Sequence, residues 1–368
     1  MTAEDDARHM RHALGLGARG LGQTWPNPAV GCVIVNGGRI VGRGWTHPGG
    51  RPHAEVRALS QAGAAARGAT AYVTLEPCAH HGHTPPCAEA LIAAGVARVV
   101  TALTDPDPRV AGRGHAMLRA AGIVVTEGVE AAAAARAHRG FLARVTAGRP
   151  MVTLKLATSL DGRIATAAGE SRWITGEAAR QAVQALRAAH DAVMVGGGTA
   201  RADDPHLTVR GMGPLRPPVR VVAARALDLP RGGRLQAADA PLWLAHDPAA
   251  TPPEAAAHWQ AAGARLLPVA APGGRIDPTA LVQRLGAEGL TRVFCEGGGA
   301  FAAALLGAGV VDELVLFTAG LALGAGGRPG LGPLAFGPLA AAPRFLLLAT
   351  EVIGGDVMQR WEAVRPLP

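Results

Sequence analysis

The feature that most restricts the fold is a pair of short stretches, RPHAEVRAL (51–59) and TLEPCAHHGHTPPCAEAL (74–91). His53 and Glu55 are two residues apart, and on a regular helix side chains at this spacing point about 160° away from each other. They can share one site only at the first turn of a helix, where the preceding proline favours entry of the chain. Cys87 follows Thr-Pro-Pro and opens an apolar-periodic segment, which predicts a second helix beginning there.

Together these stretches supply a set of zinc ligands. His53, Cys78 and Cys87 offer one imidazole and two thiolates, and a helix N-terminus favours the ionised thiolate. Three protein ligands leave the fourth tetrahedral position to water, as in a catalytic zinc site. Glu55 would then take a proton from that water and deliver it to a leaving amine. H-x-E followed by P-C and a second cysteine is typical of zinc nucleobase deaminases.

Two other interpretations of these residues stay open at this point. One is a structural zinc site with a fourth ligand from the loop histidines His80, His81 or His83. That interpretation leaves Glu55 without a role. The other is a disulfide between the two cysteines, which a cytosolic chain disfavours. The sequence therefore favours the catalytic site.

Composition limits the class of protein. The 368 residues are 49% hydrophobic and 17% charged, enough to bury a core in each of two domains. The first ten residues are too acidic and polar for a signal peptide, and no apolar run approaches the roughly 20 residues of a membrane span. Cys32 and Cys295 lie in apolar runs and are expected to be small buried residues. We expect a soluble cytoplasmic protein with no membrane partner, and the sequence leaves a homo-oligomer open.

Strand and helix patterns alternate along the first part of the chain. AVGCVIV and RIVGRGW flank Asn-Gly-Gly, which predicts a β-hairpin, and ATAYVTL, ARVVTAL and IVVTEG are further strands between helices. This order predicts an α/β layer with a largely parallel sheet. An alanine-rich helix over 129–146 ends at Ala-Gly-Arg-Pro, a signal for a linker. We therefore expect one domain over 1–147 and a second over 148–368.

The second domain repeats the alternation. PMVTLKLA, DAVMVGG, VRVVAA, APLWLA, ARLLPVA, TRVFCEGG and DELVLFT have strand character, with helical or Gly/Pro-rich pieces between them. RFLLLATEVIGGDVMQRW predicts a terminal hairpin around Gly-Gly. In VGGGTARADDP and FCEGGGAFAAALL, a strand enters a glycine-rich turn where backbone amides can approach a pyrophosphate. Neither turn is G-x-G-x-x-G, so a Rossmann domain is not indicated.

The number of residues between Cys78 and Cys87 indicates which family of deaminases the chain resembles. Eight residues, AHHGHTPP, separate them, whereas cytidine and tRNA-adenosine deaminases usually place two there. The string HAEVRAL…TLEPCAHHGHTPPCAEALI resembles the deaminase domain of the bifunctional riboflavin-biosynthesis deaminase/reductase family, as do WPNPAVGCVIV and DPDPRVAGRG. The resemblance implies a cytidine-deaminase-like α/β/α domain, with Asn27 and His80 in contact with the substrate. Two positions depart from the family pattern. Asp107 stands where Asn is common, and Thr46, followed by His47, stands where a histidine is frequent.

The second half resembles the reductase of the same family, which has a dihydrofolate-reductase-like α/β fold. LKLATSLDGRIATAAGESRWITG and ADDPHLTVR carry the likeness. It implies an NADPH site at Ala157, Trp173, Thr199, Asp203 and Gly298. It also implies contacts to the phosphorylated substrate from Ser171, Arg187, Leu207, Arg210 and Glu296. Arginine suits this task because a guanidinium binds a phosphate through two parallel hydrogen bonds.

Lys155 is the only lysine among the 36 basic residues, and it lies in the reductase-like strand TLKLATSLDG. A lysine at a strand edge with its stem packed and its amine in water is the simplest explanation. However, every other basic position of the chain uses arginine, and lysine alone offers a compact charge and a transferable proton. We therefore expect Lys155 to act catalytically near the sugar that receives hydride.

Together with the metal-site residues, the resemblance to the riboflavin-biosynthesis family implies a two-step enzyme of that pathway. Its first domain would use one zinc ion to remove the 2-amino group of a phosphoribosylamino-diaminopyrimidinone. Its second would reduce the ribosyl group of the product to ribityl with NADPH. Two other classes of protein are weighed against it. A nucleic-acid deaminase suits the net charge of +8 but not the scattered arginines or the 4% of aromatic residues. A zinc-stabilised binding protein suits the ligands but leaves Glu55 unused.

Overall fold

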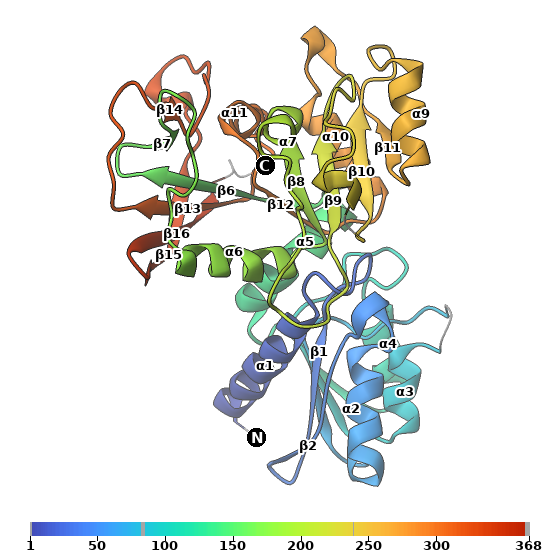
Figure 1. Ribbon diagram of the computed structural model, residues 1–368. Coiled ribbons are helices and arrows are strands. Elements are labelled where there is room, and N and C mark those ends of the chain that lie inside the picture. Colours follow the sequence, from blue (N-terminus) through green and yellow to red (C-terminus); the bar gives the residue numbers. More distant parts are fainter. Residues whose placement is uncertain (1, 82–84, 238, 365–368) are drawn as a thin grey trace. The chain divides into compact units, whose positions relative to one another are not determined.

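The computed structural model describes residues 2–81, 85–237 and 239–364. The chain divides into two compact units, Met1–Gly148 and Arg149–Pro368, which we call the N-terminal and C-terminal units. This division lies one residue after the boundary expected from the sequence. Each unit contains a sheet with helices packed on it (Figure 1). Within the described ranges, no helix is both long and apolar enough to cross a bilayer.

The N-terminal unit contains a five-stranded sheet with the order β2-β1-β3-β4-β5. Its strands are β1 (Gly31–Asn36), β2 (Arg39–Trp45), β3 (Thr70–Val73), β4 (Arg98–Thr101) and β5 (Val124–Thr126). Its helices are α1 (Ala3–Gly17), α2 (Ala54–Ala62), α3 (Cys87–Ala93), α4 (Arg113–Ala120) and α5 (Ala131–Ala147). The predicted hairpin is the β1–β2 pair. Because β1 is antiparallel to both of its neighbours, only β3, β4 and β5 are parallel, and the sheet is less parallel than the pattern predicted.

Alternate residues of β1 enter two different cores. Cys32 and Ile34 pack in a cluster with residues of α2, α3 and α4. Val33 and Val35 pack in a second cluster with residues of α1. Successive side chains of a strand point to opposite faces of a sheet, so a strand that is buried on both faces needs helices on both. The unit is therefore an α/β/α layer, as the resemblance implied.

The C-terminal unit contains a nine-stranded sheet with the order β11-β10-β9-β8-β12-β6-β13-β16-β15, and a small two-stranded sheet, β14-β7. The large sheet consists of β6 (Met151–Ser159), β8 (Ala192–Gly196), β9 (Val219–Ala223), β10 (Leu242–His246), β11 (Arg265–Pro268), β12 (Arg292–Cys295), β13 (Glu313–Ala319), β15 (Phe345–Ile353) and β16 (Asp356–Ala363). The small sheet consists of β7 (Arg163–Ala165) and β14 (Arg328–Pro329). The helices are α6 (Glu177–Ala188), α7 (Gly197–Asp203), α8 (Arg234–Ala237), α9 (Pro253–Ala261), α10 (Pro278–Ala287) and α11 (Gly299–Gly307).

All seven strands predicted inside the second domain belong to the large sheet, and the terminal hairpin is β15–β16. In the spatial order of the sheet, the strands β11, β10, β9, β8, β12, β6 and β13 are parallel to one another. β16 pairs antiparallel with β13, and β15 pairs antiparallel with β16. β8 runs directly into α7, and a glycine-rich turn joins its neighbour β12 to α11. Because these strands are parallel, both glycine-rich turns lie at the same edge of the sheet, where ligands of open α/β sheets usually bind.

Candidate functional site

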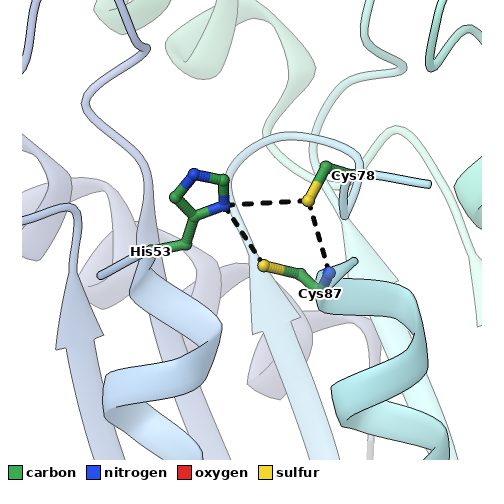
Figure 2. A group of neighbouring side chains, drawn as sticks. All are labelled: His53, Cys78 and Cys87. Carbon is green, nitrogen blue, oxygen red and sulfur yellow. Dashed lines mark hydrogen bonds between the residues drawn. The ribbon is translucent and has the colours of Figure 1, made fainter. Parts of the chain in front are cut away.

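The structure brings the three predicted metal ligands together from three separate elements (Figure 2). His53 is the N-cap residue of α2, Cys78 lies in the loop after β3, and Cys87 is the first residue of α3. His53 Nδ1 lies 3.3 Å from Cys87 Sγ and 3.7 Å from Cys78 Sγ. All three ligand atoms lie within 4.8 Å of one another. Both predicted helix starts are therefore observed, and they carry two of the three ligands.

The geometry and chemistry of this donor set fit zinc. Zn–N and Zn–S bonds of about 2.0 and 2.3 Å at tetrahedral angles place neighbouring ligand atoms about 3.5 to 3.8 Å apart. The observed separations from His53 Nδ1 are 3.3 and 3.7 Å. The described cysteines include no disulfide, so Cys78 and Cys87 are both free to act as ligands. Of the three loop histidines, His80 and His81 are not part of this cluster, and His83 lies outside the described residues.

Glu55 lies in the first turn of α2 and is only 3% exposed. Burial raises the pKa of its carboxyl, while the neighbouring His53 opposes the shift. A hydrogen bond from the Cys87 thiol is the largest cause that lowers the pKa of Cys78, to about 4. The Cys87 backbone N–H also donates to Cys78 Sγ at 3.3 Å. The site therefore combines a stabilised thiolate with a buried carboxyl whose pKa is raised, as a proton shuttle requires.

The other positions of the N-terminal unit that the resemblance singled out differ in their surroundings. His80 is half-buried, and its Nδ1 atom is buried without a hydrogen-bond partner among the described residues. Asn27 is half-buried, and its side-chain amide lies against the backbone of Gly50, in the loop that leads to α2. Thr46, at one of the departures from the family pattern, is 2% exposed and its hydroxyl accepts a hydrogen bond from Val30 N. Thr46 therefore serves the packing of β1.

Asp107, at the other departure, forms an ion pair with Arg109 within its own loop. This ion pair lowers the pKa of Asp107. Asp107 is therefore ionised.

In the C-terminal unit, three predicted residues form one charged cluster. The Arg187 guanidinium donates to both carboxylate oxygens of Glu296, at 2.5 and 3.0 Å, and to the Thr208 carbonyl at 2.7 Å. Lys155 lies in β6, beside the end of β12 that carries Glu296. Burial lowers the pKa of the Lys155 amine, whereas Glu296 opposes this shift. The lone lysine is therefore in a charged cluster rather than in open solvent at a strand edge.

The residues assigned to the cofactor occupy the glycine-rich edge of the sheet. Thr199 Oγ1 accepts a hydrogen bond of 2.8 Å from Gly298 N, so α7 and the N-terminus of α11 are joined. Arg172 donates to the Asp203 carbonyl at 3.2 Å, which ties the segment before α6 to the end of α7. Trp173 is 68% exposed on that segment. The two glycine-rich turns identified in the sequence thus meet in space.

The remaining assigned residues make less specific contacts. Ala157 lies in β6 opposite Phe317 of β13. Leu207 is 1% exposed and packs in the core, so only its backbone can face a ligand. Ser171 and Arg210 are exposed, and the Arg210 backbone N–H donates to Gln184 Oε1 at 2.9 Å.

Sequence reasoning missed Arg180, whose guanidinium lies 4.8 Å from the centre of the Trp173 ring. It also missed Asp161, which accepts hydrogen bonds from Ser159 Oγ and from the backbone N–H groups of Leu323 and Gly324. Arg180 lies on a helix that the sequence predicted only as a spacer between strands. The backbone partners of Asp161 lie 162 and 163 residues further along the chain, so no local pattern could have indicated them.

Comparison with known proteins supports both halves of this description. Residues 3–103 match the family described as the cytidine and deoxycytidylate deaminase zinc-binding region, and residues 150–358 match the RibD C-terminal domain. The chain is 44% identical over 369 residues to the riboflavin biosynthesis protein RibD of Escherichia coli (strain K12). This match covers 96% of this chain and 98% of that protein. The chain is 41% identical over 368 residues to the RibD protein of Haemophilus influenzae, with 96% of both chains covered.

Solved structures agree along the whole length. RibD from Acinetobacter baumannii superposes with a TM-score of 0.89 at 40% identity, covering 99% of this chain and 100% of that one. A Thermotoga maritima protein described as a diaminohydroxyphosphoribosylaminopyrimidine deaminase/5-amino-6-(5-phosphoribosylamino)uracil reductase superposes with a TM-score of 0.87 at 31% identity, covering 98% and 99%. With a deaminase region, a reductase region and relatives matched from end to end, this chain belongs to the RibD family of bifunctional deaminase/reductases of riboflavin biosynthesis.

Proposed function

We propose that the two units catalyse consecutive steps on one phosphorylated pyrimidine. The first, over residues 1–147, hydrolyses the 2-amino group of 2,5-diamino-6-(5-phosphoribosylamino)pyrimidin-4(3H)-one. The second, over residues 148–368, reduces the ribosyl group of that product to ribityl with NADPH. The observation that most supports this proposal is that His53, Cys78 and Cys87 lie together next to the buried carboxyl of Glu55. The name of the Thermotoga maritima relative supports the choice of substrate.

In the deaminase unit, His53, Cys78 and Cys87 would hold one zinc ion through one nitrogen and two sulfurs. When bound, zinc supplies Lewis-acid activation of water at neutral pH. Glu55 is the proton carrier, because burial raises its pKa towards the range in which a carboxyl can both accept and release a proton. It takes the proton of the attacking water and gives one to the departing amine.

Asn27 and His80 would orient the pyrimidine over this site. The Asn27 amide offers both a donor and an acceptor, and it lies against the backbone of Gly50. His80 Nδ1 has no hydrogen-bond partner among the described residues, so a substrate atom can satisfy it without breaking an existing bond.

In the reductase unit, Ala157, Trp173, Thr199, Asp203 and Gly298 would line the NADPH site. NADPH supplies the hydride when bound. No side chain of the N-cap residue Gly298 caps α11, and the backbone N–H groups in the first turn of such a helix suit the pyrophosphate of a dinucleotide. The exposed indole of Trp173 offers a flat surface for a ring of the cofactor.

The phosphorylated sugar would bind at Ser171, Arg187, Leu207, Arg210 and Glu296, with Lys155 as the catalytic group. Leu207 would contribute through its backbone, since its side chain is buried. The Arg187–Glu296 ion pair fixes the guanidinium fork in place before a ligand arrives. Lys155 is a cation whose pKa is lowered by burial, and it would orient the opened sugar or stabilise charge as hydride arrives at C1′.

Replacing Cys87 with serine tests the metal assignment. The Cys87→Ser variant should lose its zinc and its ammonia release, because a serine hydroxyl is a poor zinc ligand at neutral pH. Elemental analysis measures the metal. Incubation of the wild type with the pyrimidine substrate and NADPH measures ammonia and the fall of nicotinamide absorbance. One zinc per chain remaining in the variant would overturn the ligand assignment, and no ammonia from the wild type would overturn the proposed function.

A further inference from the structure

Glu76 is a buried carboxylate that the catalytic assignment leaves without a role. It lies two residues before the ligand Cys78 and is 4% exposed. Its two oxygens accept four backbone hydrogen bonds, all from a segment 29 to 39 residues further along the chain. A side chain that accepts this many bonds from one distant segment fixes where that segment lies.

The four donors surround the entry to α4. Glu76 Oε2 accepts from Asp105 N at 3.1 Å and from Gly112 N at 2.9 Å. Glu76 Oε1 accepts from Gly114 N at 2.9 Å and from His115 N at 3.2 Å. Gly112 is the N-cap of α4, so the carboxylate also lies at the positive end of that helix. The loop over residues 105–112 is thereby closed at both of its ends by one side chain.

An independent contact holds the same two segments together. A Cβ atom on Gly114 would lie 2.0 Å from the Pro77 carbonyl oxygen, so the backbone of α4 rests directly on the residue between Glu76 and Cys78. The closed loop carries Asp107, and the segment that follows Glu76 carries Cys78 and His80. Glu76 therefore joins this loop to the metal-ligand segment.

We propose that Glu76 is a positioning residue for the deaminase reaction. It holds the loop over 105–112 against the Cys78 segment so that the phosphorylated pyrimidine meets a preformed wall. Glu76 touches neither the substrate nor the ligand atoms. This inference rests on the proposed deamination. A carboxylate is needed because its two oxygens offer about four acceptor sites, whereas glutamine would point an NH₂ group at two of the N–H donors.

The test compares Glu76→Gln with the wild type at saturating NADPH. Glu76→Gln should raise the KM of ammonia release at least about tenfold, or about 1.4 kcal/mol of substrate binding. It should keep one zinc per chain and reduce pre-deaminated substrate at the wild-type rate. Glu76→Asp, which keeps the charge but is one methylene shorter, should give an intermediate KM. If the glutamine variant does not fold, the KM of Glu76→Asp serves as the test.

Asp6→Asn is the matched control. Asp6 is another buried carboxylate of the same unit, 6% exposed, but its partners Tyr72 and Arg98 lie away from the loop. The control should lower the melting temperature without raising the KM. The inference is overturned by a KM within twofold of wild type in both Glu76 variants. It is also overturned by loss of zinc in step with activity, or by an equal KM increase in the control. A wild type that releases no ammonia overturns the proposed deamination instead.

Discussion

Lys155 shows how much a single residue choice can indicate. Its amine lies in a cluster with Glu296 and Arg187, and burial lowers its pKa. A second cation so close to Arg187 needs a reason, because like charges in a partly buried cluster repel each other. The proposed role as the catalytic group of the reductase supplies one.

Lys155→Arg keeps the positive charge but changes the shape of the side chain and its ability to transfer a proton. The variant therefore tests whether charge alone is sufficient for reduction. Reduction should slow by about tenfold or more, which corresponds to about 1.4 kcal/mol of transition-state stabilisation. The bulkier guanidinium cannot occupy the same position or donate its proton. Nicotinamide absorbance measures the rate, while NADPH affinity and ammonia release should be little changed. An arginine variant that reduces substrate as fast as the wild type would leave Lys155 as an ordinary strand residue.

Asp105 gives the N-terminal unit a pH-dependent stability. Burial raises the pKa of its carboxyl from 3.8 to about 6, so the folded chain binds this proton more tightly than the unfolded chain. The contribution of Asp105 to the free energy of unfolding should therefore rise as the pH falls from about 7 to about 4, by at most about 3 kcal/mol.

Asp105→Asn keeps the oxygen that accepts from Asp107 N and removes the titration. Urea unfolding at several pH values should show that the difference in stability between variant and wild type is largest above pH 6 and vanishes near pH 4. Other titrating groups cancel in this difference. A difference that does not vary with pH would contradict the raised pKa.

The sequence predicted that His53, Cys78 and Cys87 would lie together and that Glu55 would lie in the first turn of a helix, because the spacing of these residues is itself geometric information. His53 and Glu55 can share a site only at a helix start, and His53 is the N-cap of α2. The Arg187–Glu296 ion pair and the role of Glu76 could not be predicted. Their partners lie 109 and 29 to 39 residues away, and nothing in the local pattern specifies such distances.

At the scale of elements, the loop that leads into α2 offers a controlled test of the Asn27 position. Gly49 and Gly50 both have positive φ, +80° and +85°. A Cβ atom on Gly49 would enter open space, whereas one on Gly50 would lie 1.9 Å from Asn27 Nδ2. The two residues therefore share the same backbone requirement and differ in their contact with Asn27.

Gly49→Ala and Gly50→Ala should each cost about 1 kcal/mol of stability, because alanine disfavours positive φ. Only Gly50→Ala should also raise the deaminase KM, since it displaces the Asn27 amide. Thermal unfolding and the concentration dependence of ammonia release measure the two effects. Equal KM values in the two variants would show that Asn27 does not orient the substrate.

Most helices and strands could be predicted from local patterns, because the alternation of apolar residues and the turn residues occupy consecutive positions of the sequence. The β1–β2 and β15–β16 hairpins and the seven strands of the second domain all lie where the patterns predicted them. The strand order did not follow from these patterns. β12 lies between β6 and β8, and β1 is antiparallel to β3, because pairing partners are chosen by packing across the whole unit.

At the scale of the whole molecule, the two compact units and their separate site residues predict independent activities. Glu55→Gln should abolish ammonia release, because the amide cannot carry a proton, and should retain one zinc per chain, because Glu55 is not among the ligands. Reduction of pre-deaminated substrate should proceed at the wild-type rate. Deamination close to the wild-type rate would show that Glu55 is not the proton carrier, and a parallel loss of reduction would show that the units are coupled.

Each unit is built from one continuous stretch of chain, Met1–Gly148 followed by Arg149–Pro368. Every ribosome that finishes this polypeptide therefore delivers both sets of site residues in a one-to-one ratio. More of this polypeptide supplies more of both catalysts, so its synthesis alone does not correct a slow second step. The balance of flux between the two steps is then set by the turnover numbers of the two sites, and selection for a smooth pathway acts on chemistry rather than on expression.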